Sequence, residues 1–298
     1  MSADAPAPRT VVAAGLSGRT LRYAEAVASD GGPRLRRLGA ADFPDDVAAA
    51  VFGSGDPDAI AAVADALADG LGGTAADVLV IAAHPTVTTS FFTPLPAALS
   101  PDDRDVQIRQ EAALLADLAP TQAVRVRAHR LRNEPGADGA DRTWYHVVHV
   151  AEPVHARLSL LADALGVDGY DLADSTRAVA AVAPAEGVSL TVGAYAGHTE
   201  VAVSRDGAFL FGTHGPSTAP ADTAYFALAA LQQARATADE VARVAVYGDD
   251  ATAERLALLA EFVGRDTEPL DPFSRFGRRP EADPAELAAF GPVLGAAL

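Results

Sequence analysis

The tetrapeptide Tyr247-Gly248-Asp249-Asp250 is the segment of this chain whose residue types point most directly to chemistry, because many RNA-templated polymerases hold two metal-binding carboxylates in it. The composition argues against that function. The 298 residues include 40 acidic and 23 basic side chains, all of the latter arginine, for a net charge of -17. Binding to nucleic acid depends on neutralising phosphates, and a short motif needs its structural context. We therefore interpret the two aspartates as turn residues at the end of the strand Val241 to Tyr247.

Isolated histidines are the other candidates for chemistry. His146 and His149 lie three residues apart in an alternating strand, so they face opposite sides and cannot chelate one metal ion. We therefore expect both side chains to be packing or surface residues and not metal ligands. His84 and His214 occupy loop positions, where functional residues concentrate, but a single histidine is a weak signal.

The overall composition sets the class of protein. The hydrophobic content of 49% is enough for a core, and the lack of cysteine excludes disulfides and thiolate metal sites. Strong acidity fits a salt-loving host, in which carboxylates keep proteins soluble. No apolar run approaches the roughly 20 residues that cross a bilayer, and the first residues do not resemble a signal peptide. We therefore expect a cytoplasmic location.

The elements that must position these residues alternate between strands and helices, which indicates an α/β protein. Thr10 to Ala14 and Leu21 to Val27 predict a β-hairpin around a glycine turn. Asp56 to Leu71 predicts a capped amphipathic helix. Asp77 to Ala83 is continuously apolar and therefore predicts an interior strand.

A change of pattern from Thr86 to Val150 predicts an inserted small subdomain. A helix follows the cap at Ser100, and Ala123 to Leu131 alternates as a strand does. The segment Asn133 to Arg142 is rich in turn residues and predicts a loop before the aromatic strand Thr143 to Val150.

The remaining segments continue the alternation. Helices are predicted at 153–165, 175–183, 222–236 and 252–263, and strands at 169–172 and 241–247. A second hairpin spans Ser189 to Val203 and continues through the tight turn at Arg205-Asp206-Gly207 into a third strand. The last part of the chain is proline-rich, with one short helix expected at Pro284 to Phe290.

Two of these segments begin alike, with a strand, a glycine-bearing turn and a strand: TVVAAGLSGRTLRYAEAV and VSLTVGAYAGHTEVAVSRDGAFLF. Each turn could direct backbone N–H groups toward an anion. The repetition suggests two similar halves around a cleft.

In this order, the motifs resemble the PilM-like type IV pilus assembly proteins of the actin-like ATPase superfamily. LTVGAYAGHTEVAVSRDGAFLF is similar to the second phosphate loop of that family, and GLSGRTLRYAEA occupies the place of the first. FFTPLPAALSPDDRDVQIRQEAALL resembles its insert, in which a proline-containing strand leads into a helix. VYGDDATAERLALLAEFVGRDTEPLDPFSRF resembles its closing segment, with Asp271-Pro272-Phe273 as the most recognisable part. The resemblance covers nearly the whole chain.

The resemblance implies an actin-like ATPase fold of two RNase H-like domains with mixed five-stranded sheets. The first domain would span residues 9–185, with the insert at about 86–150, and the second would span 186–298. It also implies nucleotide loops, here degenerate, at Gly15, Ser17, Gly18, Arg19, Thr20, Gly193, Ala194, Gly197, His198, Thr199 and Gly248.

The departures from the family pattern concern the carboxylates. Each phosphate loop of the family begins with an aspartate, but Gly15 and Thr191 stand at those positions here. Without them the means of handling magnesium and water is missing. Asp249 and Asp250 would further place negative charge beside a polyanion. We therefore expect no cofactor, no metal and no catalytic residue.

The resemblance then favours a non-catalytic cytoplasmic scaffold of a type IV pilus or related secretion or competence machine. Its partner would be the cytoplasmic tail of a single-pass membrane protein, through which the scaffold could lie at the inner membrane. The alternatives are a weak actin-like ATPase, which would gain thermal stability with ATP and magnesium, and a small-molecule kinase of the same superfamily.

Overall fold

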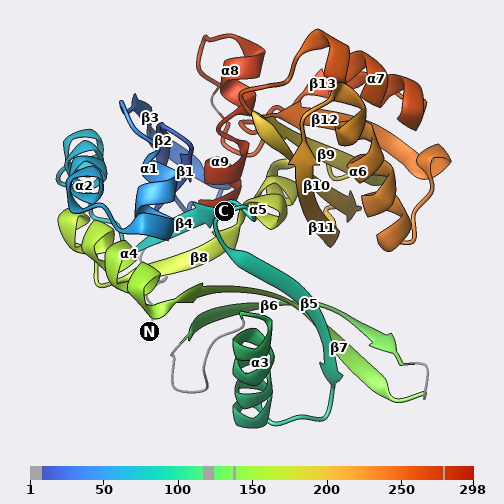
Figure 1. Ribbon diagram of the computed structural model, residues 1–298, viewed down its shortest axis with the longest axis horizontal. Helices are drawn as coiled ribbons and strands as arrows, with labels where there is room; N and C mark the ends of the chain where they lie inside the picture. The colour runs from blue at the N-terminus through green and yellow to red at the C-terminus, as the bar shows by residue number, and fades with distance from the viewer. Residues whose placement is uncertain (1–8, 117–123, 137–138, 278) are drawn as a thin grey trace.

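The computed structural model describes residues 9–116, 124–136, 139–277 and 279–298. Two five-stranded mixed sheets form its two halves (Figure 1). The first sheet has the order β3-β2-β1-β4-β8, with bounds Arg34–Asp42, Thr20–Val27, Thr10–Ser17, Val78–Ala83 and Tyr170–Asp174. The second has the order β11-β10-β9-β12-β13, with bounds Ala208–Ser217, Gly197–Arg205, Val188–Tyr195, Val241–Tyr247 and Thr267–Pro269.

The two sheets repeat one topology. In each, three successive strands pair antiparallel, and two later strands add in parallel beside the first of them. This arrangement confirms the α/β fold class and the two similar halves. Both hairpins close with two-residue turns that need a glycine: Gly18 has φ 54° and Gly197 has φ 89°. The predicted tight turn between β10 and β11 is also present, with Asp206 and Gly207 both at positive φ.

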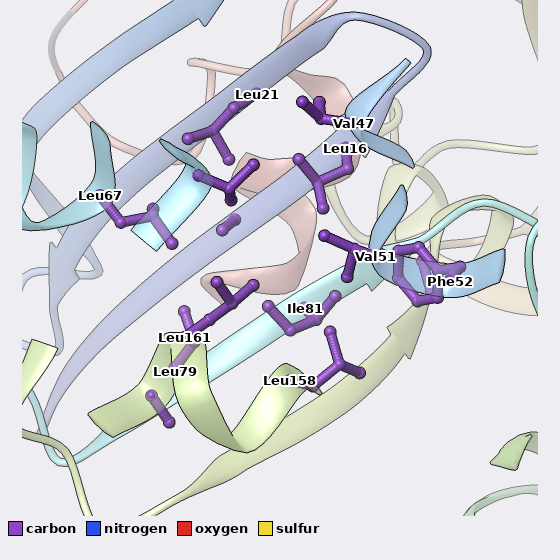
Figure 2. Close-up of a cluster of buried hydrophobic side chains, with 14 of the residues drawn as sticks. Leu16, Leu21, Val47, Val51, Phe52, Leu67, Leu79, Ile81, Leu158 and Leu161 are labelled. Carbon is purple, nitrogen blue, oxygen red and sulfur yellow. The ribbon is translucent and has the colours of Figure 1, made fainter. Parts of the chain in front are cut away.

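The helices and sheets stack in layers. Helices α2 (Pro57–Leu71) and α4 (Glu152–Leu165) cover the outer face of the first sheet, and Figure 2 shows their leucines packed on that face. Helices α6 (Pro220–Gln233) and α7 (Ala253–Val263) cover the outer face of the second. Between the sheets lie three short helices, α5 (Ser175–Val182), α8 (Pro284–Ala288) and α9 (Gly291–Ala296). One apolar cluster spans this middle layer and both sheets, so the halves share part of their core.

Local sequence explains where the long helices begin. Asp56, Ser100 and Thr252 cap helices with side-chain oxygens that accept backbone N–H groups. Proline occupies the first turn of α2 and of α3 (Pro101–Leu115). Shorter helical segments are α1 (Val47–Ala49), a π-helical turn (Ala50–Ser54) and a 3-10 turn (Ala238–Glu240).

The insert forms a small three-stranded sheet of order β5-β7-β6, with bounds Thr89–Pro96, Asp141–Ala151 and Val124–Pro135, and carries α3 (Pro101–Leu115). Figure 1 shows it below the two halves. The loop predicted from Asn133 to Arg142 is shorter than expected, because Pro135 pairs with Asp141 and both strands run further into it. Ala123, where the strand Ala123 to Leu131 was predicted to begin, lies outside the described residues.

None of the helices in the described part of the chain combines the length and the apolar character that a bilayer crossing requires.

Candidate functional site

The turn between β1 and β2 is tied to the chain that follows it. Arg19 Nε donates to the carbonyl of Phe43 at 2.7 Å, and Phe43 N donates back to the carbonyl of Arg19 at 2.9 Å. The carbonyl of Gly18 accepts from Ala48 N, and Thr20 Oγ1 donates to Asp42. Arg19 therefore anchors the turn to its own half of the molecule.

The turn between β9 and β10 is stabilised by contacts between residues of the same hairpin. Thr199 is buried, and its Oγ1 donates to the carbonyl of Gly193 at 2.9 Å. The ring of His198 stacks on that of Tyr195, with centroids 4.7 Å apart and planes inclined by 6°. Both side chains are thereby fixed across the two ends of the turn.

The segment after β12 packs directly on this second hairpin. A Cβ on Gly248, which has φ 97°, would lie 2.3 Å from the carbonyl oxygen of Ala194, and Asp250 N donates to that oxygen. A Cβ on Gly193 would lie 2.7 Å from the ring of Tyr247. Both glycines thus permit close approach of protein to protein.

The two aspartates after Gly248 are not free charges, contrary to the expectation that they would simply add negative potential. Asp249 pairs with Arg22 of β2 at 2.6 Å, an ion pair that joins the two halves. Asp250 pairs with Arg255 at 3.1 Å, and Arg255 also donates to Ser217 and Thr223. The tetrapeptide is a turn, as predicted, and its carboxylates are used for structure.

The two positions at which the resembling family carries an aspartate offer no carboxylate here. Gly15 faces helix α9, where an added Cβ would lie 3.0 Å from Val293, and Thr191 offers a buried hydroxyl in place of a carboxylate. The Oγ1 of Thr191 has no hydrogen-bond partner within the described residues. Arg19 and Arg22 are already paired. Gly193 and Gly248 pack on protein groups, whereas an added Cβ on Gly18 or Gly197 would meet nothing within 4 Å.

A buried polar cluster is centred on Glu200 of β10, in the second sheet. Glu200 Oε1 lies 2.7 Å from Nδ1 of His84, which follows β4, and 3.4 Å from Nε2 of His198. Ser175 Oγ and Tyr247 OH donate to Glu200 Oε2 at 2.7 and 3.1 Å. The cluster joins the end of β4, the start of α5 and the second sheet.

The electrostatics of the cluster are those of a buried ion pair. Burial alone would raise the pKa of Glu200, but the charge of His84 and hydrogen bonds from His198, His84 and Ser175 hold that pKa well below its usual range. Burial alone would lower the pKa of His84, but the charge of Glu200 and its hydrogen bond raise it above the ordinary value. Burial and the charge of Glu200 together raise the pKa of Tyr247.

Sequence reasoning considered His84 and His198 separately and missed Glu200 and Ser175. The available signal was a carboxylate within the apolar strand Thr199 to Val203, because a charge in such a strand needs partners when it is buried. His146 and His149 lie on opposite faces of β7, as predicted. His146 stacks on Phe92 with centroids 4.6 Å apart, and His149 makes an edge contact with Phe91. His214 is exposed on β11.

Two pockets border β6, which pairs only with β7 among the described strands. A pocket of about 660 Å³ lies toward α3. Its lining combines five arginines with the carboxylates of Asp105 and Glu152: Arg104, Arg109, Arg125, Arg127 and Arg130. A second pocket of about 340 Å³ separates β6 from β8 and is lined by Val126, His155, Tyr170 and Leu172, among others. Arg127 of β6 pairs with Asp171 of β8 at 2.8 Å.

No protein-family model and no curated protein matches this chain. Solved structures do match. A chain of the PilM-PilN type IV pilus biogenesis complex superposes with a TM-score of 0.66 at 14% sequence identity, covering 96% of this chain and 97% of that one. This protein has the actin-like ATPase fold.

A second match supports the actin-like fold. A protein from Bacteroides thetaiotaomicron with actin-like ATPase fold and unknown function superposes with a TM-score of 0.51 at 9% identity, covering 87% of this chain and 90% of that one. The PilM-like, actin-like resemblance found in the sequence is therefore confirmed at the level of the fold.

Proposed function

We propose that this protein is a non-catalytic scaffold of a type IV pilus or related secretion machine, and that it holds the cytoplasmic tail of a membrane-anchored partner. The likeness to a chain of the PilM-PilN complex supports the proposal. The observation that carries it is the pair of pockets on either side of the edge strand β6. An edge strand offers unpaired backbone groups to an added peptide strand.

The charge distribution indicates which chemical groups the partner's tail would carry. The chain carries a net charge of -17, yet five arginines line one of these pockets. Arg109 is exposed and forms no ion pair with a carboxylate of the described residues. Arg125 pairs with Glu152 at 3.3 Å, with both side chains about half exposed. An extended tail bearing carboxylates, with apolar side chains for the pocket lined by Val126, Tyr170 and Leu172, matches these two surfaces.

Peptides copying the amino-terminal tails of single-pass membrane proteins encoded beside its gene test the proposal. One such peptide should bind the full chain, measured by fluorescence anisotropy. The double variant Arg109→Glu and Arg125→Glu should weaken binding about tenfold or more, equivalent to about 1.4 kcal/mol.

Arg243→Glu is the matched control. Arg243 is paired with Glu268 in the second half, and both side chains are about as exposed as those of Arg125 and Glu152. This variant should bind like the wild type. Failure of every neighbouring tail to bind, or equal loss of binding in the control, would contradict the proposal.

We further propose that the cleft does not bind nucleotide. The support is the packing of Gly248 on Ala194, of Tyr247 over Gly193, and the pairing of Arg22 with Asp249. Because a ligand of the native state raises the melting temperature, Mg-ATP at millimolar concentration should leave the melting temperature unchanged. A clear rise would restore the ATPase alternative.

A further inference from the structure

We propose that His84, His198 and Glu200 bind a divalent transition metal ion, for which Zn²⁺ has the matching donor set. One ligand atom from each of the three residues lies within 4.8 Å of the other two. Two imidazole nitrogens and one carboxylate oxygen are a ligand set that zinc accepts with a fourth position left for water. The site lies apart from the proposed tail groove, and it takes one ligand, His198, from the predicted nucleotide loops.

The distances between the three ligand atoms need only a small change to match those of a tetrahedral zinc site. His84 Nδ1 and His198 Nε2 now lie 2.7 and 3.4 Å from Glu200 Oε1. Zinc bonds of about 2.0 to 2.2 Å in a tetrahedron separate ligand atoms by about 3.3 to 3.6 Å. An ion can therefore replace the hydrogen bond from His84 if that ring withdraws by less than about 1 Å.

The surrounding residues already hold the ligands in place. Ser175 and Tyr247 both donate to Glu200 Oε2, so Oε1 is the oxygen directed at the two imidazoles. Tyr195 stacks on His198 and meets the ring of His84 edge-on at 5.2 Å. Hydrogen bonds to a ligating carboxylate and fixed rings are what metal sites use to orient their ligands.

The environment also favours a cation and allows it to enter. Glu200 and the nearby Asp174 are both fully buried carboxylates. The side chain of His198 is 19% exposed, whereas those of His84 and Glu200 are 7% and 0% exposed, so His198 marks the approach from solvent. Because His84 comes from the first half and His198 and Glu200 from the second, the ion would connect the halves.

The test titrates the full chain, stripped with a chelator, with Zn²⁺ in a calorimeter and with Co²⁺ in a spectrophotometer. The wild type should bind one equivalent, gain thermal stability and give the visible bands of tetrahedral cobalt. His198→Ala should lose at least about tenfold in affinity and lose those bands, and Ser175→Ala should weaken binding by about tenfold while keeping the bands. His198 is chosen because its partial exposure makes folding of the variant secure, which circular dichroism checks.

His214→Ala is the control, since His214 is exposed on β11 outside the cluster. It should bind metal as the wild type does. Absence of a saturable site overturns the proposal. Binding that His198→Ala leaves unchanged also overturns it, because such binding would indicate ions held by surface carboxylates. Neither result bears on tail binding, which the peptide titration measures separately.

Discussion

At the scale of single residues, Gly248 and Gly264 share a positive φ but differ in what surrounds them. Gly248 has a positive φ, and the carbonyl oxygen of Ala194 lies 2.3 Å from the position that a Cβ would occupy. Gly264 has a similar positive φ of 70°, but nothing lies within 4 Å of its added Cβ. An alanine substitution at Gly264 therefore measures the cost of backbone strain alone, and the same substitution at Gly248 measures strain together with steric overlap.

Gly248→Ala should lower the free energy of unfolding by about 2 to 4 kcal/mol, because the substitution adds overlap with Ala194 to the strain of the left-handed backbone. Gly264→Ala should cost about 1 to 2 kcal/mol, from strain alone. Urea denaturation of both variants measures the difference. Equal losses would mean that the segment after β12 is not packed on Ala194 as described.

At the scale of elements, the small sheet carries three histidines whose pKa values are lowered, with His146 and His149 buried and His129 half-buried. Burial, Arg177 and Arg127 lower the pKa of His129 to about 3, and Leu172 O is its hydrogen-bond acceptor at 3.4 Å. Burial also lowers the pKa of His146, where Asp174 opposes it, and of His149. Protonation of any of them opposes the packing of β6 and β7.

The pH dependence follows from the direction of these shifts. Since the unfolded histidine has a pKa near 6.5, the unfolded chain binds more protons below that pH, and stability falls as the pH falls. The stabilising contribution of neutral His129 is complete above pH 6.5 and declines toward its folded pKa of about 3, by at most about 1.4 kcal/mol per pH unit. The contribution of His84, whose pKa is raised, is already complete below pH 6.5, so it adds no slope there.

His129→Gln should therefore lose less stability than the wild type between about pH 6.5 and 5, where carboxylates remain ionised. Urea unfolding at several pH values measures the slope. His214→Gln, at an exposed position, should retain the wild-type slope. A slope unchanged in His129→Gln would show that His129 is not kept neutral by the fold.

Sequence patterns predicted elements well where local signals agreed with the final packing. The strand Val241 to Tyr247 has the predicted bounds, and α2 follows its cap at Asp56. β3 went unpredicted because RLRRLGAAD lacks a buried face. Helix α9 went unpredicted because GPVLGA has poor helix propensity and forms against α5, where an added Cβ on Gly295 would lie 1.8 Å from the carbonyl oxygen of Ala178.

The polar cluster could not be predicted for a topological reason. His84 and Glu200 are 116 residues apart, and each looks ordinary in its local sequence. They meet because the end of β4 in the first sheet comes into direct contact with the start of β10 in the second sheet, beside Ser175 of α5. The nucleotide-loop positions that the resemblance implies stay a prediction. The Arg19 side chain, for example, donates to the carbonyl of Phe43, 24 residues further along the chain, and local patterns do not specify such a partner.

At the scale of the whole molecule, the net charge of -17 is a source of self-repulsion. Added salt screens it, since the Debye length is about 8 Å near 0.15 M and shorter above that. The melting temperature should therefore rise with sodium chloride. The double variant Asp65→Asn and Asp69→Asn removes two exposed like charges one turn apart on α2, so it should melt higher than the wild type at low salt and gain less from added salt. A melting temperature that falls with salt would contradict this account.

Helix α9 has a consequence for the order in which the protein can be made. It packs on β1, β4 and α5, and Val293 and Leu294 belong to the apolar cluster between the two sheets. The inner face of β1, which begins at Thr10, is therefore covered only when α9, which begins at Gly291, has formed. During synthesis on the ribosome, that face stays open to solvent until nearly all of these residues have emerged, and contacts this distant in sequence form slowly. Chaperone dependence is accordingly expected to be greatest for ribosome-bound chains that end before α9.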